Sequence, residues 1–296
     1  MKILVTGAGG FVGKRLVKHL AASGHSVIAM ARRSPAPEDA EYFSSPNVSV
    51  ILHDLASLDV SALPPGIEAV FTLAQSSRFR DFPEGTDDVL AVNVTANVKL
   101  FQWARQTGVK RFIHVSSGGI YGGGSNSVKR EEALFAVDSP LGFYLGSRLC
   151  GEILFQSFTG FFETAVILRP FFIYGAGQRK DMFVTRIIES VASGAPVTLH
   201  GHDGLKTNPV YVDDAVWAFA ASLNLSGCHV LNIGGPDVLS LRALSSAVGK
   251  SVGREPVFSV VDKEAVDYVG DISNARMKLG FVPMGFENGL KLTLPR

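Results

Sequence analysis

Residues 1–24 of the chain read MKILVTGAGGFVGKRLVKHLAASG, and this stretch decides the fold. The apolar run at residues 2–6 predicts a buried strand, because a strand that is covered on both faces has no polar side. Apolar residues three to four positions apart predict a helix over residues 11–23, which ends before Gly24. A strand, a glycine-rich turn and a helix in direct succession are typical of the first unit of a doubly wound sheet.

The turn itself, TGAGGFVG, places glycines at positions 7, 10 and 13. A turn without side chains lets backbone N–H groups and the helix N-terminus approach a pyrophosphate, and the third glycine permits close packing of the helix. Glycine turns also occur for purely structural reasons, but the strand–turn–helix context favours a dinucleotide site. We expect cofactor contacts from Gly7, Gly10, Phe11, Val12 and Gly13.

The end of the next predicted strand, residues 26–31, bears on the choice of cofactor. A NAD site of this type usually carries an acidic residue there, which holds the ribose 2′-hydroxyl. Here Arg32 and Arg33 follow the strand. Two guanidinium groups can bind a 2′-phosphate that no carboxylate repels, so the sequence favours NADP, with NAD as the alternative. A solvated basic loop is the competing interpretation. Asp54, after the third strand, could accept a hydrogen bond from the adenine amino group or simply cap its loop.

Strands and helices continue to alternate up to about residue 170. Further strands are expected at residues 48–52, 69–73, 111–116 and 164–169, and a second crossover helix at 88–106. This pattern predicts an α/β fold, a doubly wound parallel (Rossmann) sheet over residues 1–170. Residues 171–296 are expected to form a smaller lobe, while residues 203–233 return to the sheet through a helix at 213–223 and a strand at 229–233.

The amino-acid composition argues against nucleic acids and membranes as binding partners. The 296 residues include 28 basic and 27 acidic side chains, and the formal net charge of +1 gives no electrostatic basis for binding nucleic acid or an anionic membrane. The most apolar stretch, which starts at Ile153, is interrupted by polar residues, so no segment of about 20 apolar residues could span a bilayer. Cys150 and Cys228 form no CxxC motif. We expect a cytoplasmic protein with reduced, buried cysteines and a small-molecule substrate.

Tyr144 is the strongest catalytic candidate. Hydride transfer from a carbinol needs a base for the hydroxyl proton, and a phenol, whose reference pKa is about 10, must be made more acidic. One cation about 4 Å away contributes about 4 kcal/mol at an effective dielectric constant of 20, or about three pKa units. Of the six tyrosines, only Tyr144 has a basic residue, Arg148, four positions later on the same helix face.

Two further sets of polar residues have competing interpretations. Ser117 follows a predicted strand, at the edge where parallel sheets bind ligands, and could hold a substrate oxygen; a loop serine bonded to backbone is the alternative. His200 and His202 in the HGHDG segment have one aspartate beside them and no third distant ligand, so no metal site is expected. Asp213 and Asp214 are expected to begin a helix, with a role near the nucleotide or at the junction of the lobes as the alternative.

Several segments together resemble the extended short-chain dehydrogenase/reductase family, in its NAD-dependent epimerase/dehydratase group. The segments are TGAGGFVG (6–13), VFTLAQ (70–75), NVTANVKLFQWARQTGVKRFIHVSSGGIYG (93–122), YLGSR (144–148), LRPFFIYGAGQ (168–178) and NPVYVDD (208–214). They follow one another in order across nearly the whole chain. The resemblance implies a Rossmann domain, a substrate-binding C-terminal lobe and a homodimer formed through two helices.

The resemblance also implies site residues. The family's serine and tyrosine fall on Ser117 and Tyr144, and its lysine position is occupied by Arg148, a departure from the family pattern. Further cofactor contacts are expected from Leu55, Leu73, Ala74, Gln75, Asn93, Val115 and Pro170. Substrate contacts are expected from Ser76, Gly118, Tyr121, Phe171 and Phe172, although the two phenylalanines could equally belong to an aromatic core.

Two departures from related enzymes bear on the reaction. The 4,6-dehydratases of the family carry an Asp–Glu pair where this chain has Gly118 and Gly119, which argues against dehydration. The basic residue that often holds a nucleotide-sugar phosphate is replaced by Thr207, with Lys206 beside it as a candidate substitute. We therefore expect an NAD(P)-dependent oxidoreductase or epimerase acting at a carbinol or ketone, on a nucleotide sugar. The alternative is a catalytically weak NADP-binding sensor or regulatory module.

Overall fold

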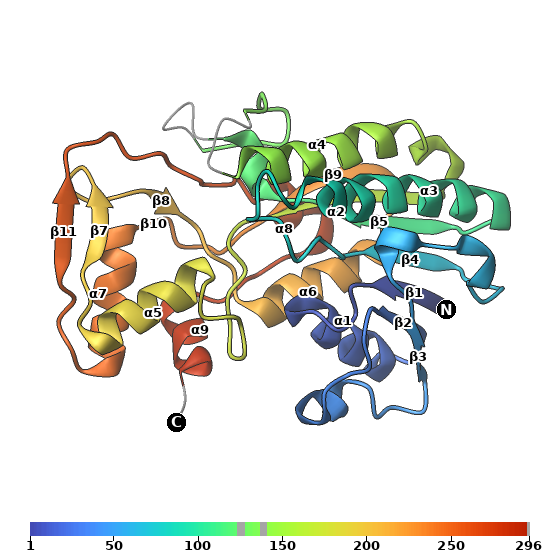
Figure 1. The fold of residues 1–296 in the computed structure, drawn as a ribbon, viewed down its shortest axis with the longest axis horizontal. Helices are drawn as coiled ribbons and strands as arrows, with labels where there is room; N and C mark the ends of the chain where they lie inside the picture. The colour runs from blue at the N-terminus through green and yellow to red at the C-terminus, as the bar shows by residue number, and fades with distance from the viewer. Residues whose placement is uncertain (123–127, 137–140, 295–296) are drawn as a thin grey trace. The chain divides into compact units, whose positions relative to one another are not determined.

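The computed structural model describes residues 1–122, 128–136 and 141–294 (Figure 1). The chain forms two compact units, and both are discontinuous in sequence. The first contains Met1–Ile120, Val137–Arg169 and Val216–Leu231. The second contains Tyr121–Ala136, Pro170–Ala215 and Asn232–Arg296.

The first unit is built on a sheet with the strand order β3-β2-β1-β4-β5-β6-β9. The bounds of its strands are β1 Lys2–Thr6, β2 Ser26–Ala31, β3 Val48–Leu52, β4 Ala69–Thr72, β5 Arg111–Val115, β6 Thr164–Pro170 and β9 Gly227–Ile233. The pairs from β3 across to β6 are all parallel. The chain adds β2 and β3 on one side of β1 and then crosses to place β4 on the other side. This reversal defines a doubly wound sheet, so the predicted α/β Rossmann class is confirmed.

Helices cover the two faces of this sheet, α3 and α4 on one side and α1 and α6 on the other (Figure 1). Their bounds are α1 Phe11–Ala22, α2 Thr86–Leu90, α3 Ala96–Thr107, α4 Gly142–Gln156 and α6 Val212–Ala221. The helix expected at 88–106 is instead three pieces: α2, a π-helical turn at Ala91–Thr95, and α3. The π turn carries Asn93, which belongs to the site described below.

Two strands are shorter than the sequence predicts. β4 and β5 end at Thr72 and Val115, one residue before their expected ends. Leu73 and Ser116 leave the sheet because the next residues turn into the loops at its carboxyl edge. These loops carry most of the candidate site residues.

A buried ion pair joins α4 to β6. Arg169 Nη2 lies 2.7 Å from Glu152 Oε2, and Arg169 Nε lies 3.1 Å from both carboxylate oxygens. The two side chains are only 2% and 1% exposed. Without water each charge depends on the other, so the pair fixes the position of α4 over the sheet.

The second unit contains two small two-stranded sheets. β7 (Val197–His200) runs parallel to β11 (Phe258–Val261), and β8 (Lys206–Thr207) runs antiparallel to β10 (Leu239–Ser240). Its helices are α5 Phe183–Ser193, α7 Leu241–Val252, α8 Ser273–Leu279 and α9 Phe286–Thr293.

The segment Tyr121–Ala136 belongs to this second unit, although the sequence places it within the first 170 residues. Lys129 N donates to Val269 O at 2.8 Å, and Asn232 Nδ2 donates to Lys129 O at 3.0 Å. These partners lie more than 100 positions away in the chain, so local patterning gave no sign of them.

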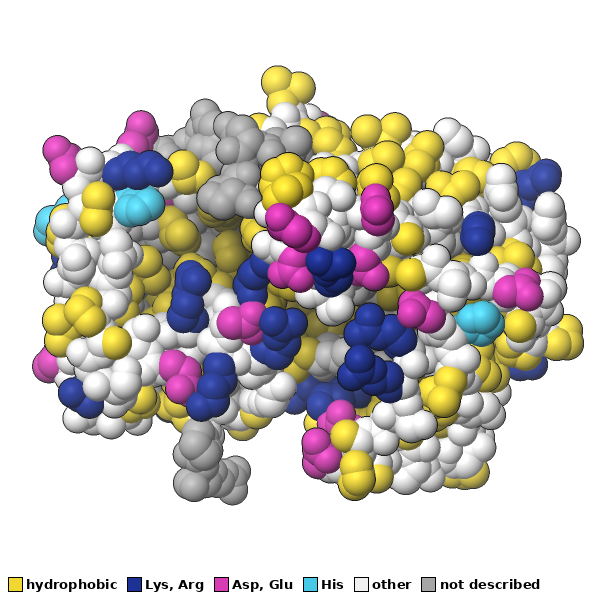
Figure 2. Space-filling view, viewed as in Figure 1, with side chains coloured by type: hydrophobic (Ala, Val, Ile, Leu, Met, Phe, Trp, Pro, Cys, Tyr) yellow, Lys and Arg dark blue, Asp and Glu magenta, His cyan; other side chains and the backbone are white. Residues whose placement is uncertain are grey.

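The surface agrees with the near-zero net charge. On the face drawn in Figure 2, Lys and Arg side chains are interspersed with Asp and Glu side chains.

Cys150 and Cys228 are free, as expected, but both are exposed, so the prediction of buried cysteines is wrong. Cys150 lies on the outer side of α4, and Cys228 lies on β9, the last strand of the sheet. Within the described residues, no helix is long and apolar enough to cross a membrane.

His114 on β5 is buried beneath α4. Its Nδ1 lies 2.8 Å from Thr72 Oγ1, and the rings of Phe101 and Phe155 pack against it with centroids 5.7 Å away. Burial, and to a lesser extent the positive charge of Arg148, lower the pKa of His114 to about 3. The imidazole therefore stays neutral in the folded protein at all but strongly acidic pH.

We expect this histidine to destabilise the fold in acid. In the unfolded chain the His114 imidazole takes up a proton below its ordinary pKa of 6.5. In the folded protein the same imidazole is protonated only below about pH 3. The free energy of unfolding should fall between these values, by about 2 kcal/mol from pH 7 to pH 5. In His114→Asn this part of the fall should disappear, as measured by urea unfolding at both pH values. His202→Asn, at an exposed histidine, should keep the wild-type pH dependence, and an equally steep fall in His114→Asn would contradict the prediction.

Candidate active site

The glycine turn between β1 and α1 is shaped as the sequence predicts for a pyrophosphate. Gly7 has φ +68°, and a Cβ placed on it would lie 2.8 Å from Ala74 Cα. A Cβ on Gly13 would lie 2.1 Å from Gly7 O, the carbonyl that accepts a hydrogen bond from Gly10 N at 2.9 Å. The turn therefore excludes side chains at both positions, and α1 begins at Phe11 with its N-terminal N–H groups facing the turn. This arrangement fits a dinucleotide cofactor.

Basic residues near this turn divide into two groups. Tyr42 packs under three cations of α1, whose charged groups lie 5.0–5.7 Å from its ring centroid: Lys14, Arg15 and Lys18. Ion pairs further tie Lys14 to Asp39 and Lys18 to Glu41. Arg32 and Arg33, by contrast, are exposed at the end of β2, and within the described part of the chain neither makes an ion pair. These two guanidinium groups are available to a ligand.

Asp54 serves as a loop cap. Its Oδ1 accepts a hydrogen bond from Ala56 N at 3.0 Å and begins a 3₁₀ turn, Leu55–Ser57. Leu55 is half-buried against the core of the first unit. The structure thus gives Asp54 a local role and shows no feature that reserves it for adenine.

Tyr144 lies in the first turn of α4, beside the loop that follows β4. Its Oη donates a hydrogen bond to Gln75 Oε1 at 2.8 Å. Its ring packs against Phe79, with centroids 5.1 Å apart. Burial raises the pKa of the Tyr144 phenol, and the positive charge of Arg148 opposes this rise only in part. The phenol is therefore protonated in the ligand-free site, and the prediction that the charge of Arg148 makes it more acidic than an ordinary phenol is wrong, because burial outweighs that charge.

Arg148 is almost completely buried, with 3% of its surface exposed. Nη1 donates to Ala74 O at 3.2 Å, while Nη2 donates to Val115 O and, at 3.5 Å, to Ser116 O. The guanidinium thus bridges the carboxyl ends of β4 and β5. A lysine ammonium is a compact point charge without this planar fork. Arginine at the position of the family's lysine therefore keeps the positive charge and also links the ends of β4 and β5 by hydrogen bonds.

Ser117 combines the two interpretations that its sequence allowed. Its Oγ accepts a hydrogen bond from Gly119 N at 3.1 Å, as a loop serine would. A hydroxyl group also has one hydrogen to donate, and this hydrogen remains available for a substrate oxygen. A Cβ on Gly119 would lie 2.8 Å from Leu145 Cδ2, so a carboxylate side chain at this position would have to displace the end of the Leu145 side chain on α4.

Asn93 and Ser76 lie within a buried hydrogen-bond network beside the site. Asn93 Oδ1 accepts from Ser76 N and Asn93 Nδ2 donates to Ser147 Oγ, both at 2.9 Å. Ser147 Oγ donates to Tyr144 O at 2.7 Å, and Ser76 Oγ donates to the Asp88 carboxylate. These side chains hold the loop after β4 and the start of α4. Ser147 was absent from the sequence prediction, although a small polar residue on the inner face of a helix was the available signal.

The remaining predicted residues lie at strand ends or in the second unit. Leu73, Ala74, Val115 and Pro170 lie at the carboxyl ends of β4, β5 and β6. Tyr121 donates from Oη to Asn232 Oδ1 at 2.8 Å and stacks on Phe171 with centroids 6.1 Å apart. Both rings are almost fully buried, which matches the core interpretation for Phe171. Phe172 has φ 42° and packs against Phe183 at 4.5 Å.

Lys206 and Thr207 form the short strand β8. Thr207 is fully buried, and its Oγ1 has no hydrogen-bond partner among the described residues. Lys206 is exposed, because successive side chains of a strand point to opposite faces. The Lys206 side chain therefore points to the opposite face of β8 from Thr207.

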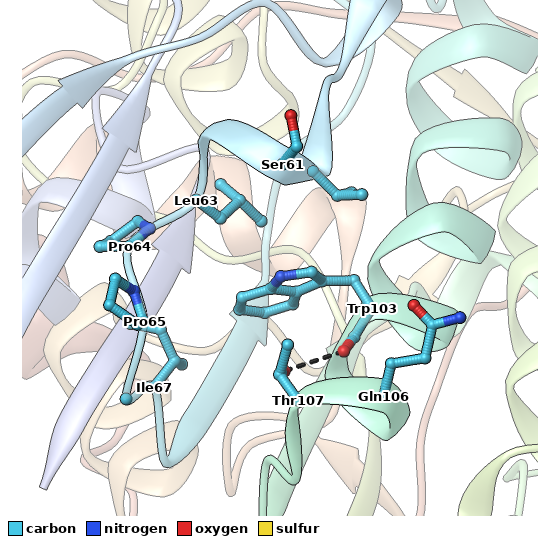
Figure 3. A pocket seen from close by; sticks show the side chains of 10 residues that line it. Ser61, Leu63, Pro64, Pro65, Ile67, Trp103, Gln106 and Thr107 are labelled. Carbon is cyan, nitrogen blue, oxygen red and sulfur yellow. Dashed lines mark hydrogen bonds between the residues drawn. The ribbon is translucent and has the colours of Figure 1, made fainter.

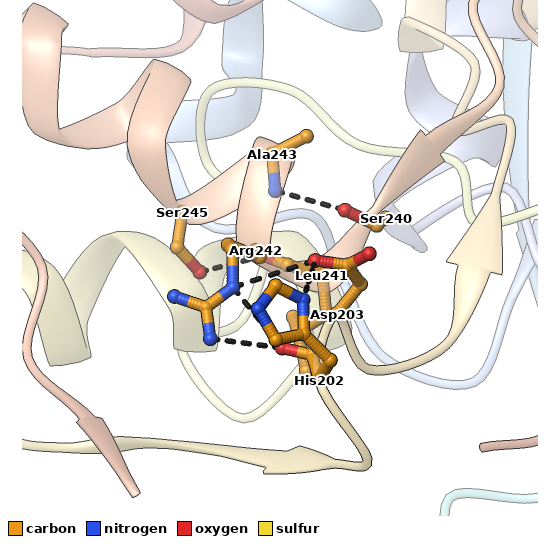
Figure 4. Close-up of polar contacts among 7 residues, drawn as sticks. All are labelled: His202, Asp203, Ser240, Leu241, Arg242, Ala243 and Ser245. Atoms are coloured by element: carbon orange, nitrogen blue, oxygen red, sulfur yellow. Dashed lines mark hydrogen bonds and ion pairs between the residues drawn. The ribbon is translucent and has the colours of Figure 1, made fainter. Parts of the chain in front are cut away.

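The HGHDG segment is anchored to the start of α7 (Figure 4). His202 Nδ1 lies 2.9 Å from Asp203 Oδ1, and Arg242 Nη2 donates to His202 O at 2.8 Å. The Arg242 guanidinium also covers the ring of Phe258 at 4.5 Å. Within residues 1–122, 128–136 and 141–294, no three His, Cys, Asp or Glu side chains gather as metal ligands would.

A separate hollow of about 410 Å³ lies at the opposite edge of the sheet (Figure 3). Trp103 and Thr107 of α3 line one side of it, and the loop before β4, with Leu63 and Pro64, lines the other. None of the candidate site residues lines it. Ligands of parallel sheets bind at the carboxyl ends of the strands, so this hollow is not the active site.

Comparison with known proteins identifies relatives along nearly the whole chain. The model of the NAD dependent epimerase/dehydratase family matches residues 3–234. The uncharacterized UDP-glucose epimerase YtcB of Bacillus subtilis is 29% identical over 299 residues, which cover 96% of this chain and 93% of that protein.

Solved structures similar to this protein also cover nearly the whole chain. MoeE5 in complex with UDP-glucose and NAD is 31% identical and superposes with a TM-score of 0.83, covering 99% of this chain and 97% of that one. UDP-glucuronic acid 4-epimerase from Bacillus cereus, in complex with UDP-glucuronic acid and NAD, is 28% identical, with a TM-score of 0.85 and coverage of 99% and 98%.

We expect an added methyl group at Gly13, but not at Gly9, to weaken cofactor binding. Gly13→Ala should weaken binding of nicotinamide dinucleotides at least about tenfold, because its Cβ would collide with Gly7 O and distort the pyrophosphate turn. Gly9→Ala, whose Cβ would lie 3.6 Å from Ala31 Cβ, should bind like the wild type. Isothermal titration of both variants measures the difference, and equal weakening by the two substitutions would show that the turn tolerates no change at all.

Proposed function

The chain belongs to the NAD dependent epimerase/dehydratase family, and we propose that it inverts C4 of a UDP-linked sugar. The observation that carries the proposal is Tyr144, whose phenol lies at the carboxyl edge of the sheet with the buried cation of Arg148 one helical turn away. Similar proteins support the substrate class, since they include a UDP-glucuronate 4-epimerase and a UDP-glucose 4-epimerase.

The side chains of the first unit can move the proton that such a reaction requires. Tyr144 Oη takes the proton of the sugar hydroxyl as the carbon is oxidised and returns it when the ketone is reduced. Ser117 Oγ donates to the same oxygen and holds it in place. Bound NAD(P) supplies the hydride acceptor and donor. Because the proton and the hydride are both returned to the sugar, its oxidation state does not change. C4 is inverted when the hydride is returned to the face of the ketone opposite to the one it left.

The environment of Gly118 and Gly119 supports epimerisation over dehydration. Loss of water from the sugar needs an acid and a base at adjacent carbons, and the residues at these positions have no side chain. Arg148 also argues for a working enzyme, because it keeps its positive charge beside Tyr144. The sensor alternative depended on the loss of the family's lysine.

NADP(H) is our proposal for the preferred cofactor. Arg32 and Arg33 are exposed at the end of β2, where no carboxylate follows the strand, and the cations of α1 already have other partners. The similar solved structures were determined with NAD, so the choice depends on these two side chains.

A cytoplasmic homodimer completes the proposal. Ile153, Leu154 and Phe161 are 53%, 36% and 57% exposed on and just after α4, and burying such an apolar surface favours association. Two free, exposed cysteines suit a reducing compartment.

Tyr144→Phe tests the reaction. We expect turnover of UDP-glucose or UDP-glucuronate to fall about 10²- to 10⁴-fold, because proton transfer is lost, while cofactor affinity changes less than about twofold. NMR of the sugar nucleotide should show the 4-epimer with wild-type protein and no 4-keto-6-deoxy product. Tyr42→Phe, which removes a phenol outside the site, serves as the control. Undiminished turnover in Tyr144→Phe would refute the mechanism.

Arg32→Ala combined with Arg33→Ala tests the cofactor. Wild-type protein should bind NADPH at least about tenfold more tightly than NADH, because charge-assisted contacts to a phosphate contribute about 1.5–3 kcal/mol each. The double variant should lose most of that difference, whereas Lys18→Ala, at a cation paired with Glu41, should keep it. Fluorescence titration with both dinucleotides measures this, and equal wild-type affinities would exclude NADP preference.

A further inference from the structure

We propose that Gln75 is a positioning residue that serves Tyr144 in both of its protonation states, accepting a hydrogen bond from the phenol and donating one to the phenolate. The inference rests on the proposed function, in which Tyr144 alternates between these two states during each turnover.

The contact is direct. Tyr144 Oη donates to Gln75 Oε1 at 2.8 Å, a normal length for an O–H···O hydrogen bond. Phe79 packs against the Tyr144 ring from the same loop after β4. The loop therefore holds the tyrosine at its ring and at its hydroxyl group.

The backbone of Gln75 is fixed on both sides. Before it, Ala74 N donates to Thr6 Oγ1 at 3.4 Å, and Ala74 O accepts from Arg148 Nη1 at 3.2 Å. After it, Ser76 N donates to Asn93 Oδ1 at 2.9 Å. Although the Gln75 side chain is exposed, it starts from a backbone that is tied to β1, α4 and the π turn. Such a rigid origin is what a positioning residue requires.

A carboxamide suits a partner that gains and loses a proton. Its oxygen accepts from a phenol, and its NH₂ group donates to a phenolate once the terminal amide turns over. A carboxylate could only accept and would oppose the phenolate with its charge. An aliphatic side chain could serve neither state.

The phenolate needs a donor of this kind. Arg148, whose positive charge acts on Tyr144, directs its Nη atoms to the carbonyl oxygens of Ala74, Val115 and Ser116. Its charge acts on Tyr144 through space, while burial acts in the opposite direction. A hydrogen bond from the Gln75 NH₂ group would stabilise the phenolate at short range.

Two substitutions separate the parts of this proposal, and Ser77→Ala, at an exposed neighbour in the same loop, is the control. In Gln75→Glu we expect the pKa of the Tyr144 phenol to rise by about one unit or more, because a negative charge now faces the phenolate. NMR titration of ¹³Cζ-labelled tyrosine reports this value without any turnover, and Tyr144→Phe assigns the signal. The rising limb of the pH–kcat profile should shift upward by the same amount.

In Gln75→Leu we expect kcat to fall about tenfold, while KM for the sugar nucleotide changes less than about twofold. An unchanged tyrosine titration in Gln75→Glu would overturn the proposal, as would wild-type kcat in Gln75→Leu. Because the titration needs no substrate, a shifted pKa together with no turnover of any UDP-sugar would refute the proposed function and leave the Gln75 contact supported.

Discussion

A buried guanidinium group must find acceptors inside the protein, because a charge without water or partners is costly. Arg148 directs its two Nη groups to the carbonyl oxygens at the ends of β4 and β5, and these contacts tie α4 to the carboxyl edge of the sheet. Tyr144, one turn earlier, is placed over the loop after β4 as a result. The geometry of the site follows from this one requirement.

A second buried charge on α4 also ties this helix to the sheet. Glu152 follows Arg148 by four residues on the inner face of α4 and pairs with Arg169 at the end of β6. The helix is thus held by opposite charges against three neighbouring strands, β4, β5 and β6. Asn93 and Ser147 add an uncharged link from the π turn. Rigidity at this edge gives the reacting groups a defined arrangement before any ligand arrives.

The sequence predicted well what depends on local pattern. Apolar runs located six of the seven strands of the Rossmann sheet, because most of these strands are buried on both faces and this leaves little choice of residue. The glycine turn was recognisable because only glycine fits at positions 7 and 13. Prediction failed where partners are distant in the chain. Nothing near Ser76 shows that its N–H reaches Asn93, and nothing near Lys129 shows that it joins the second unit. The exposed cysteines show that residue type alone does not determine burial.

The contact between position 119 and Leu145 has a consequence for how such a protein can change its chemistry. Leu145 is 5% exposed, and any side chain larger than hydrogen at 119 would push against it. A mutation that brings a carboxylate to this position would first disturb the packing of α4, before it could provide an acid or a base. Acquiring the Asp–Glu pair of the dehydratases would therefore need new side chains at both Gly118 and Gly119, together with a shift of the Leu145 side chain.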